Sequence, residues 1–178
     1  MPPFDTIVIG AGIGGACAAL ALVRRGAAVA LIEAGSIPRH KVCGEFLSPE
    51  SRDIFARLGV EEAVLAAQPQ CVTTARIVTT RGRSLEIPLP DGAIALSRFR
   101  LDHILWDAAN AAGVCCLSRT RAQSIEHTTE GFVVTTSNGQ LQARCVIAAP
   151  GRNAAWLERS RRVGEWENGG VGASRSRR

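Results

Sequence analysis

The chain has 178 residues, of which 46% are hydrophobic and 21% charged, a composition typical of one soluble globular domain. It contains no uninterrupted apolar run of the roughly 18 residues that a membrane-spanning helix needs, and the start MPPFD does not resemble a secretory signal, so we expect a cytoplasmic protein without a transmembrane segment. The net charge is +5, but residues 152–178 contribute +4 of it through seven arginines and three glutamates, so no nucleic-acid binding is expected of the remaining domain.

The first elements in the chain predict a βαβ unit. A buried parallel strand is expected over Thr6–Ile9, an alanine-rich helix over Ile13–Arg25, and a second strand over Ala28–Ile32. Together they span about thirty residues, the usual size of such a unit. The sequence therefore predicts an α/β fold of the Rossmann-like, dinucleotide-binding kind.

Three glycines stand between the first strand and the helix in the pattern GxGxxG. Gly10 permits a tight turn, Gly12 lets a diphosphate approach the backbone, and Gly15 lets the helix pack closely on the strand. The helix N-terminus then offers unpaired amides and the positive end of its dipole to the phosphates. Glu33 ends the second strand and can accept hydrogen bonds from ribose hydroxyls. An acid here argues against a 2′-phosphate, so the motif predicts FAD or NAD rather than NADP.

The middle of the chain departs from this βαβ pattern. After a loop over residues 34–50, a helix is expected over Glu50–Leu58. The alternating segment Cys71–Leu96, with the turn signals Arg81-Gly82 and Asp91-Gly92, predicts half-buried antiparallel strands outside the parallel sheet. A helix over Arg100–Ala112 follows, and Gly113 is a suitable residue to end it.

The last third of the chain predicts further strands and then a tail. Ala122–His127 and Phe132–Thr136 form a hairpin, and Cys145–Ala149 is typical of a buried strand. We expect residues 1–157 to form the folded domain, with the antiparallel segment at about 71–96, and residues 158–178 to form a disordered basic tail. The six cysteines show no CxxC pair and no metal-ligand spacing, and we expect Cys17, Cys115 and Cys145 to be buried thiols: the sequence predicts no metal site.

Three stretches resemble the geranylgeranyl reductase family of FAD-dependent oxidoreductases, which is related to the aromatic-hydroxylase-type flavin monooxygenases and the flavin-dependent halogenases. They are IPRHKVCGEFLSPES after the second strand, SRFRLDHILWDAANAAGV around a helix start, and ARCVIAAPGRNAA near residue 150. The matches span roughly residues 5 to 155 in the expected order. The resemblance implies FAD as the cofactor, NAD(P)H as the electron donor, and a small isoprenoid or aromatic substrate.

The same resemblance implies where FAD is held. The glycine turn would bind the diphosphate, Glu33 the ribose, and Arg39 the adenosine or diphosphate, while Cys43 and Gly44 would face the isoalloxazine. Arg98 would contact the phosphates or the ribityl chain, and the remaining positions would border the adenosine end. The implied cofactor-binding residues are Gly10, Gly12, Ile13, Gly14, Gly15, Glu33, Ala34, Arg39, Cys43, Gly44, Arg98, Ala122, Ala149 and Gly151.

Plainer readings of these residues remain open. The run Arg39-His40-Lys41 is also typical of a solvated charged surface, Cys43 of an ordinary loop thiol, and Arg98 of an ion pair with Asp102 one turn along the helix. No residue pair stands out as a catalytic acid and base, so the catalytic residues are unknown.

The family's downstream Gly-Asp cofactor motif has no counterpart, because no Gly-Asp dipeptide occurs in the sequence. We therefore expect a chain truncated at its C-terminus relative to the family. Two alternatives to an FAD-dependent oxidoreductase stay open: a catalytically inactive FAD- or nucleotide-binding remnant, and an NAD-dependent dehydrogenase.

Overall fold

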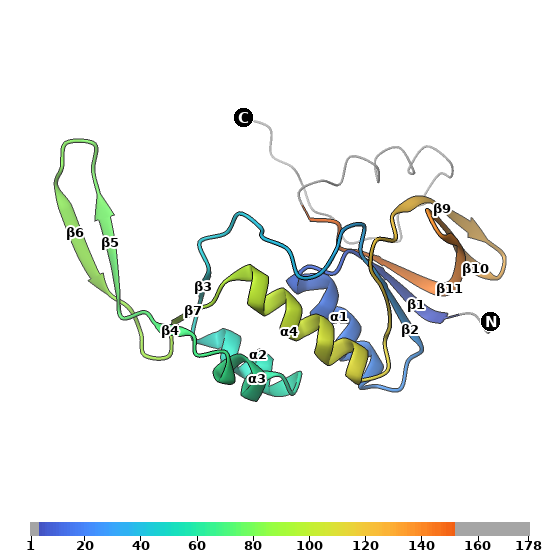
Figure 1. Cartoon of the computed structure of the whole chain (residues 1–178), viewed down its shortest axis with the longest axis horizontal. Helices are drawn as coiled ribbons and strands as arrows, with labels where there is room; N and C mark the ends of the chain where they lie inside the picture. Colours follow the sequence, from blue (N-terminus) through green and yellow to red (C-terminus); the bar gives the residue numbers. More distant parts are fainter. Residues whose placement is uncertain (1–3, 152–178) are drawn as a thin grey trace.

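A computed structural model describes residues 4–151, so the predicted tail lies outside the described residues (Figure 1). A mixed sheet forms its centre, with the strand order β8-β2-β1-β11-β10-β9. The first four strands in this order are parallel, and the last two continue the sheet in antiparallel fashion. The strands are β1 (Phe4–Ile9), β2 (Val29–Ile32), β8 (Cys115–Leu117), β9 (Ala122–Thr128), β10 (Gly131–Thr136) and β11 (Gly139–Ala148).

Two helices, α1 (Ile13–Val23) and α4 (Arg98–Ala111), lie side by side against one face of the parallel strands (Figure 1). Alternate residues of a strand point to opposite faces. Val8 and Leu31 therefore join the helices in one core cluster, whereas Ile7 belongs to a second cluster on the other face. Burial on both faces explains why β1 and β2 are almost continuously apolar.

A second region lies near the N-terminal end of α4, the end opposite to the one that leads into β8 (Figure 1). It holds α2 (Glu50–Arg57), α3 (Glu61–Ala66), a small sheet in the order β3-β7-β4, and a two-stranded ribbon of β5 and β6. The antiparallel strands predicted within residues 71–96 are confirmed, and they are separate from the parallel sheet. They are β4 (Gln70–Cys71), β5 (Thr74–Val78), β6 (Ser84–Pro88) and β7 (Ile94–Ala95), whereas β3 (Phe46–Leu47) lies in the segment expected to be a loop.

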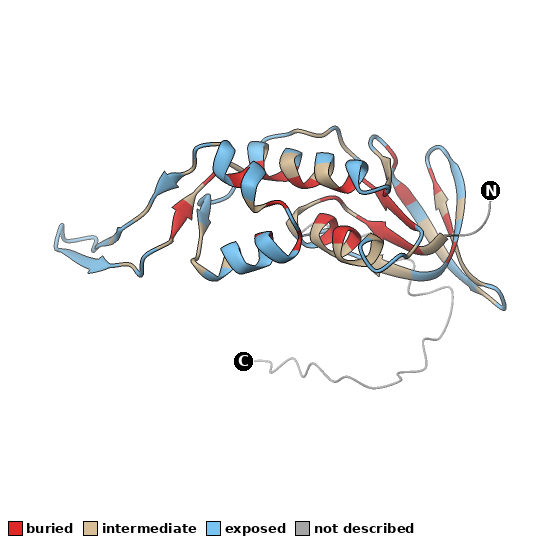
Figure 2. Ribbon diagram, turned by 90° about the horizontal axis from the view of Figure 1, so that it is seen from below, coloured by how far each residue is buried: buried red, intermediate tan, exposed pale blue. Residues whose placement is uncertain are grey.

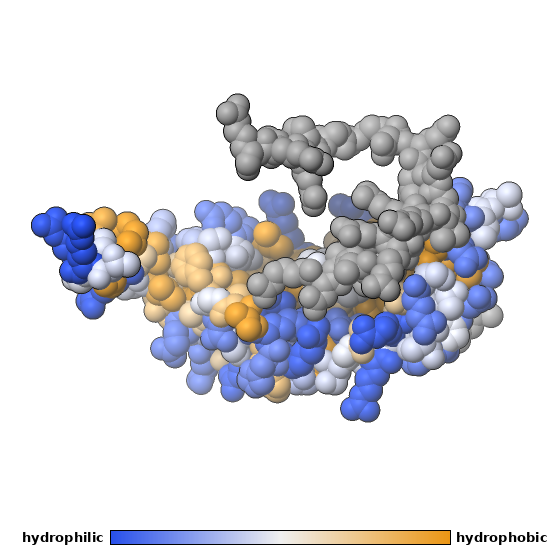
Figure 3. All heavy atoms as spheres, turned by 90° about the horizontal axis from the view of Figure 1, so that it is seen from above, coloured by the Kyte–Doolittle hydropathy of each residue, from blue (hydrophilic) through white to orange (hydrophobic). Residues whose placement is uncertain are grey.

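The expectation that this whole segment is half-buried is wrong for the ribbon. Ile77, Val78 and Leu85 are 55%, 62% and 60% exposed. The ribbon projects from the body, and no other described element packs extensively on it (Figures 1 and 2). Apolar side chains consequently reach the surface along this arm (Figure 3). Alternation in the sequence therefore indicates strands here without indicating what covers them.

Several element boundaries differ from the prediction. Helix α4 begins at Arg98 rather than Arg100, because the Ser97 side chain caps it by accepting a hydrogen bond from the Arg100 amide. Strand β8 was not predicted, and β11 is longer than expected. Of the three cysteines expected to be buried, Cys145 is exposed, and Cys17 and Cys115 are half-buried. Among residues 4–151, no helix is long and apolar enough to cross a membrane.

Candidate functional site

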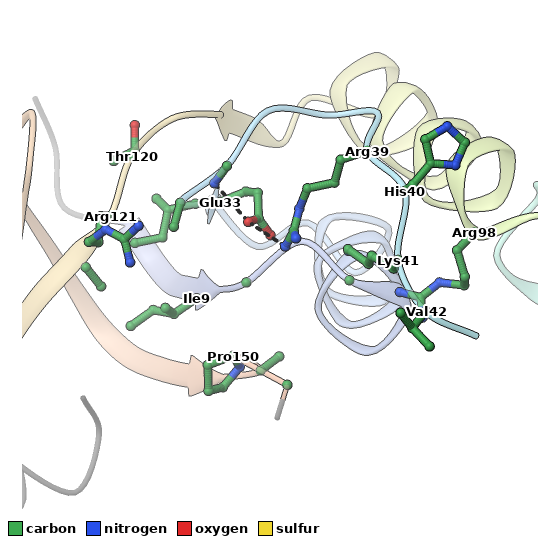
Figure 4. Close-up of a pocket in the computed structure, with 18 residues that line it drawn as sticks. Ile9, Glu33, Arg39, His40, Lys41, Val42, Arg98, Thr120, Arg121 and Pro150 are labelled. Carbon is green, nitrogen blue, oxygen red and sulfur yellow. Dashed lines mark hydrogen bonds and ion pairs between the residues drawn. The ribbon is translucent and has the colours of Figure 1, made fainter. Parts of the chain in front are cut away.

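A cavity of about 830 Å³ opens at the carboxyl ends of the parallel strands (Figure 4). Strand β1 lies between β2 on one side and β11 on the other. The connection that follows β1 leads through α1 to β2 and away from β11, which makes this a point where the strand order reverses. In open α/β sheets, ligands bind in the crevice at such a point. The volume is within the range of ~300–1,000 Å³ typical of small-molecule sites. The lining residues are Ile9, Gly10, Gly12, Ile32, Glu33, Ala34, Gly35, Arg39, His40, Lys41, Val42, Arg98, Thr120, Arg121, Ala122, Ala149, Pro150 and Gly151.

The glycine turn brings β1, α1 and β11 unusually close together. Gly10 has φ +101°, a conformation that favours glycine, and a Cβ there would lie 2.4 Å from the Ala149 carbonyl oxygen. A Cβ on Gly15 would lie 1.8 Å from the Gly10 carbonyl oxygen. The predicted roles of these two glycines, a tight turn and close helix packing, are therefore present in the structure.

The N-terminus of α1 is open toward the cavity. Gly12 is its N-cap, no side chain of the described residues caps it, and the first turn contains no acid. The first amides of a helix lack partners within the helix and carry the positive end of its dipole. A Cβ on Gly12 would face the Arg98 Nη2 at 3.7 Å and the Lys41 Nζ at 3.8 Å. The space above the turn is thus bordered by amides on one side and two cations on the other, an arrangement suited to a diphosphate.

Glu33 is fixed at the end of β2 by three donors. Its side chain is 7% exposed. One carboxylate oxygen accepts from the Ala11 amide at 3.0 Å, and the other accepts from the Gly35 amide at 3.0 Å and the Arg39 Nη2 at 3.2 Å (Figure 4). These bonds hold an acceptor at the cavity wall in a defined orientation, as the ribose prediction requires.

A buried acid, Asp102, contacts both cations beside Gly12. Its side chain is 2% exposed; it accepts from the Lys41 Nζ at 2.5 Å, and from the Arg98 Nε at 2.8 Å and Nη2 at 3.1 Å. The hydrogen bond to Asp102 raises the pKa of Arg98. The ion pair proposed from sequence is therefore present, and Arg98 also lines the cavity, so the two readings of this arginine are compatible.

The loop that carries Lys41 is held against the start of α4. The His40 ring stacks on Phe99, with ring centroids 4.7 Å apart. Together with the ion pairs to Asp102 and Glu33, this contact attaches residues 39–41 to two elements. The charged run is therefore a part of the cavity wall, although Arg39 and His40 are themselves exposed.

Most residues predicted to surround a cofactor line the cavity, and some do not. Ile13 packs its side chain on the larger core cluster, a Cβ on Gly14 would meet nothing within 4 Å, and Gly15 serves packing. Cys43 and Gly44 are exposed beyond the cavity lining. The predicted residues that line the cavity are Gly10, Gly12, Glu33, Ala34, Arg39, Arg98, Ala122, Ala149 and Gly151.

Sequence reasoning left Asp102 and nine of the lining residues out of the predicted cofactor-binding set; the nine are Ile9, Ile32, Gly35, His40, Lys41, Val42, Thr120, Arg121 and Pro150. Lys41 lies in a run that also fits a solvated surface, and Asp102 was considered only as a helical partner of Arg98. Thr120 and Arg121 precede the β9 strand and carry no motif of their own, yet they line the cavity together with Ala122. In the described part of the chain, no three His, Cys, Asp or Glu side chains gather closely enough to hold a metal ion.

Curated proteins with related sequences include a monooxygenase, a reductase and an uncharacterized protein. A squalene monooxygenase of Brassica napus is 31% identical over 49% of this chain, and a menaquinone reductase of Mycolicibacterium smegmatis is 28% identical over 72% of it. An uncharacterized protein from the nifH2 5′ region of Methanosarcina barkeri is 30% identical over 85% of this chain and 84% of its own length. The chain spans only 17% of the squalene monooxygenase and 32% of the menaquinone reductase.

Solved structures share the fold. A flavoprotein/dehydrogenase of Cytophaga hutchinsonii superposes with a TM-score of 0.76 at 25% identity, covering 90% of this chain and 41% of that one. The myxobacterial chondrochloren halogenase, an FAD-dependent enzyme, superposes with a TM-score of 0.74 at 27% identity, covering 85% and 38%. The FAD binding domain family matches residues 3–161. The chain therefore belongs to the FAD binding domain family.

Proposed function

We propose that the cavity binds FAD and that the chain is the FAD-binding part of an oxidoreductase acting on a small lipid-like or aromatic molecule, with NAD(P)H as electron donor. One observation carries the proposal: the bare glycine turn and the α1 N-terminus face Lys41 and Arg98 across an open space, with Glu33 farther along the same cavity. Bound FAD would supply the redox chemistry. The protein would bind and orient it.

Each end of the cavity fits a different part of the cofactor. The first amides of α1 would hold the diphosphate, because they have no partner within the helix. Lys41 and Arg98 would hold it as well, because they are the cations nearest Gly12. Glu33 would accept a hydrogen bond from the adenosine ribose, since its position is already fixed by backbone amides. Ala122 and Ala149 would border the adenine side.

The type of reaction follows from resemblance rather than from geometry. The Arg-His-Lys-x-Cys-Gly-Glu loop favours reduction of isoprenoid double bonds, as in the geranylgeranyl reductases. The related proteins include one named a menaquinone reductase and one named a squalene monooxygenase, so both reduction and oxygenation of lipid-like molecules have support. We place reduction first because the loop is the most specific of the three matches.

A second candidate is an FAD- or NAD-binding domain without its own catalysis. The exposure of Cys43 and Gly44 favours it, because these two residues, expected to face the isoalloxazine, do not line the cavity. Titration with FAD and with NAD tests which dinucleotide binds: preferential FAD binding supports a flavoprotein, and tight NAD binding without FAD binding supports the alternative of an NAD-dependent dehydrogenase. Loss of the bound flavin's absorption on addition of NAD(P)H would separate the oxidoreductase from a domain without catalysis.

The direct test is an absorption spectrum of the protein purified with and without added FAD, followed by replacement of Gly12. Gly12→Leu would fill the space in front of Lys41 and Arg98 and prevent FAD uptake, whereas Gly12→Ala should retain part of it. Both variants should keep the wild-type melting temperature, since the extended N-cap backbone accepts any residue. A folded Gly12→Leu variant that takes up FAD as the wild type does would overturn the proposal.

A further inference from the structure

Asp102 does not line the cavity, yet it forms ion pairs with both cations that border the space above Gly12. Lys41 comes from the loop after β2, 61 positions away in the sequence, and Arg98 from the first turn of α4. Their side chains are only 17% and 19% exposed. The acid therefore joins two separate segments at one point.

The three charges explain why the cations can share this position. Two positive groups pointing at one small space repel each other, and a carboxylate bonded to both offsets the repulsion. Arg98 meets Asp102 through two of its nitrogens, which fixes the plane of the guanidinium. A lysine and an arginine carry more N–H donors than the three bonds to Asp102 use, and two cations with one carboxylate leave the cluster a net positive charge.

We infer that Asp102 is a positioning residue for the diphosphate of the bound nucleotide: it aims Lys41 and Arg98 at the space above Gly12. The inference rests on the proposed function. It assigns Asp102 no contact with the ligand, and it predicts that the acid strengthens the binding of an anion although its own charge is negative.

The sign of the effect distinguishes this role from simple electrostatics. If Asp102 only lowered the local positive potential, Asp102→Asn would strengthen diphosphate binding. If Asp102 aims the cations, the same change weakens it, because both side chains lose their fixed direction. A defect in folding alone would instead weaken all ligands to the same degree.

The test measures binding of ADP and of adenosine to the full chain by calorimetry, in the wild type, Asp102→Asn and Asp107→Asn. Asp107 is the matched control, because it lies on the same helix with its side chain 64% exposed. We expect Asp102→Asn to bind ADP at least about tenfold more weakly, the effect of one lost charged hydrogen bond, with adenosine binding unchanged. Asp107→Asn should match the wild type for both ligands.

Three results would overturn the inference. The first is unchanged or tighter ADP binding by Asp102→Asn. The second is an equal loss of ADP affinity and adenosine affinity in that variant. The third is a loss of ADP affinity relative to the wild type in the Asp107→Asn control. If Asp102→Asn does not fold, Asp102→Glu serves instead: it keeps the negative charge but moves the carboxylate by one methylene, so both cations lose their aim and the same ADP-selective loss is expected. A wild-type chain that binds neither ADP nor FAD refutes the proposed function as well, whereas wild-type ADP binding that Asp102→Asn retains refutes only the role of Asp102.

Discussion

Replacing Gly15 by alanine isolates the close approach between α1 and the glycine turn. The added Cβ would lie 1.8 Å from the Gly10 oxygen and 3.3 Å from the Ala149 Cβ, where ordinary contacts begin at 3.4 Å. Overpacking typically costs about 1–3 kcal/mol. Because the nearest clash is with backbone, which cannot rotate away, we expect Gly15→Ala to lower the free energy of unfolding by about 3 kcal/mol.

The neighbouring Gly14 provides the matched control. A Cβ there meets nothing within 4 Å, and alanine favours a helix over glycine by up to about 1 kcal/mol, so Gly14→Ala should be neutral or stabilising. Urea denaturation measures both free energies. For a domain of this size, 1 kcal/mol corresponds to roughly 2–4 °C, so thermal melts should separate the two variants clearly. A Gly15→Ala variant as stable as Gly14→Ala would refute the reasoning.

Three further predictions concern other parts of the structure. Glu33→Gln removes the charge that would bind ribose, so adenosine affinity should fall about tenfold by calorimetry; an unchanged affinity would contradict that role. Burial, reinforced by Cys115 and Asp107, raises the pKa of Cys116 to about 11, so iodoacetamide at pH 8 should label the exposed Cys145 well before Cys116 in a mass-spectrometric time course. Because the unfolded thiol ionises near 9.0, the Cys116 contribution to stability is intact below pH 9 and is lost as the pH rises toward 11. Leu85→Lys on the exposed ribbon should change the free energy of unfolding by less than about 0.5 kcal/mol, whereas truncation of a buried leucine such as Leu101 to alanine should cost about 2–5 kcal/mol; a large loss at Leu85 would mean that the ribbon is covered in solution.

The sequence was sufficient for the βαβ unit and the glycine turn because both depend on neighbours within about thirty residues. Periodicity identified β1, α1 and β2, and Glu33 was placed correctly at the end of β2. It did not identify β8, whose three residues are too few to form a pattern. Nor could it pair Lys41 with Asp102, because a contact between distant positions leaves no periodic signal in one sequence.

The exposed ribbon illustrates the other limit of sequence reasoning. Alternation predicts a strand with two different faces, but which face is covered depends on elements elsewhere. Ile77 and Leu85 satisfy the pattern and are nevertheless exposed. Site residues without a motif, such as Arg121, are found only after the sheet brings them beside the glycine turn.

The position of β11 has a consequence for how the protein is made. Strand β1 pairs with β2, which follows it directly, and with β11, the final strand of the described chain. During synthesis the ribosome releases the glycine turn early, but the wall formed by Ala149 arrives only after β11 has been translated and inserted beside β1. Such non-local pairing forms slowly. A nascent chain would therefore bind a cofactor in this cavity only after the whole sheet has assembled, because the first βαβ unit alone lacks the wall formed by Ala149.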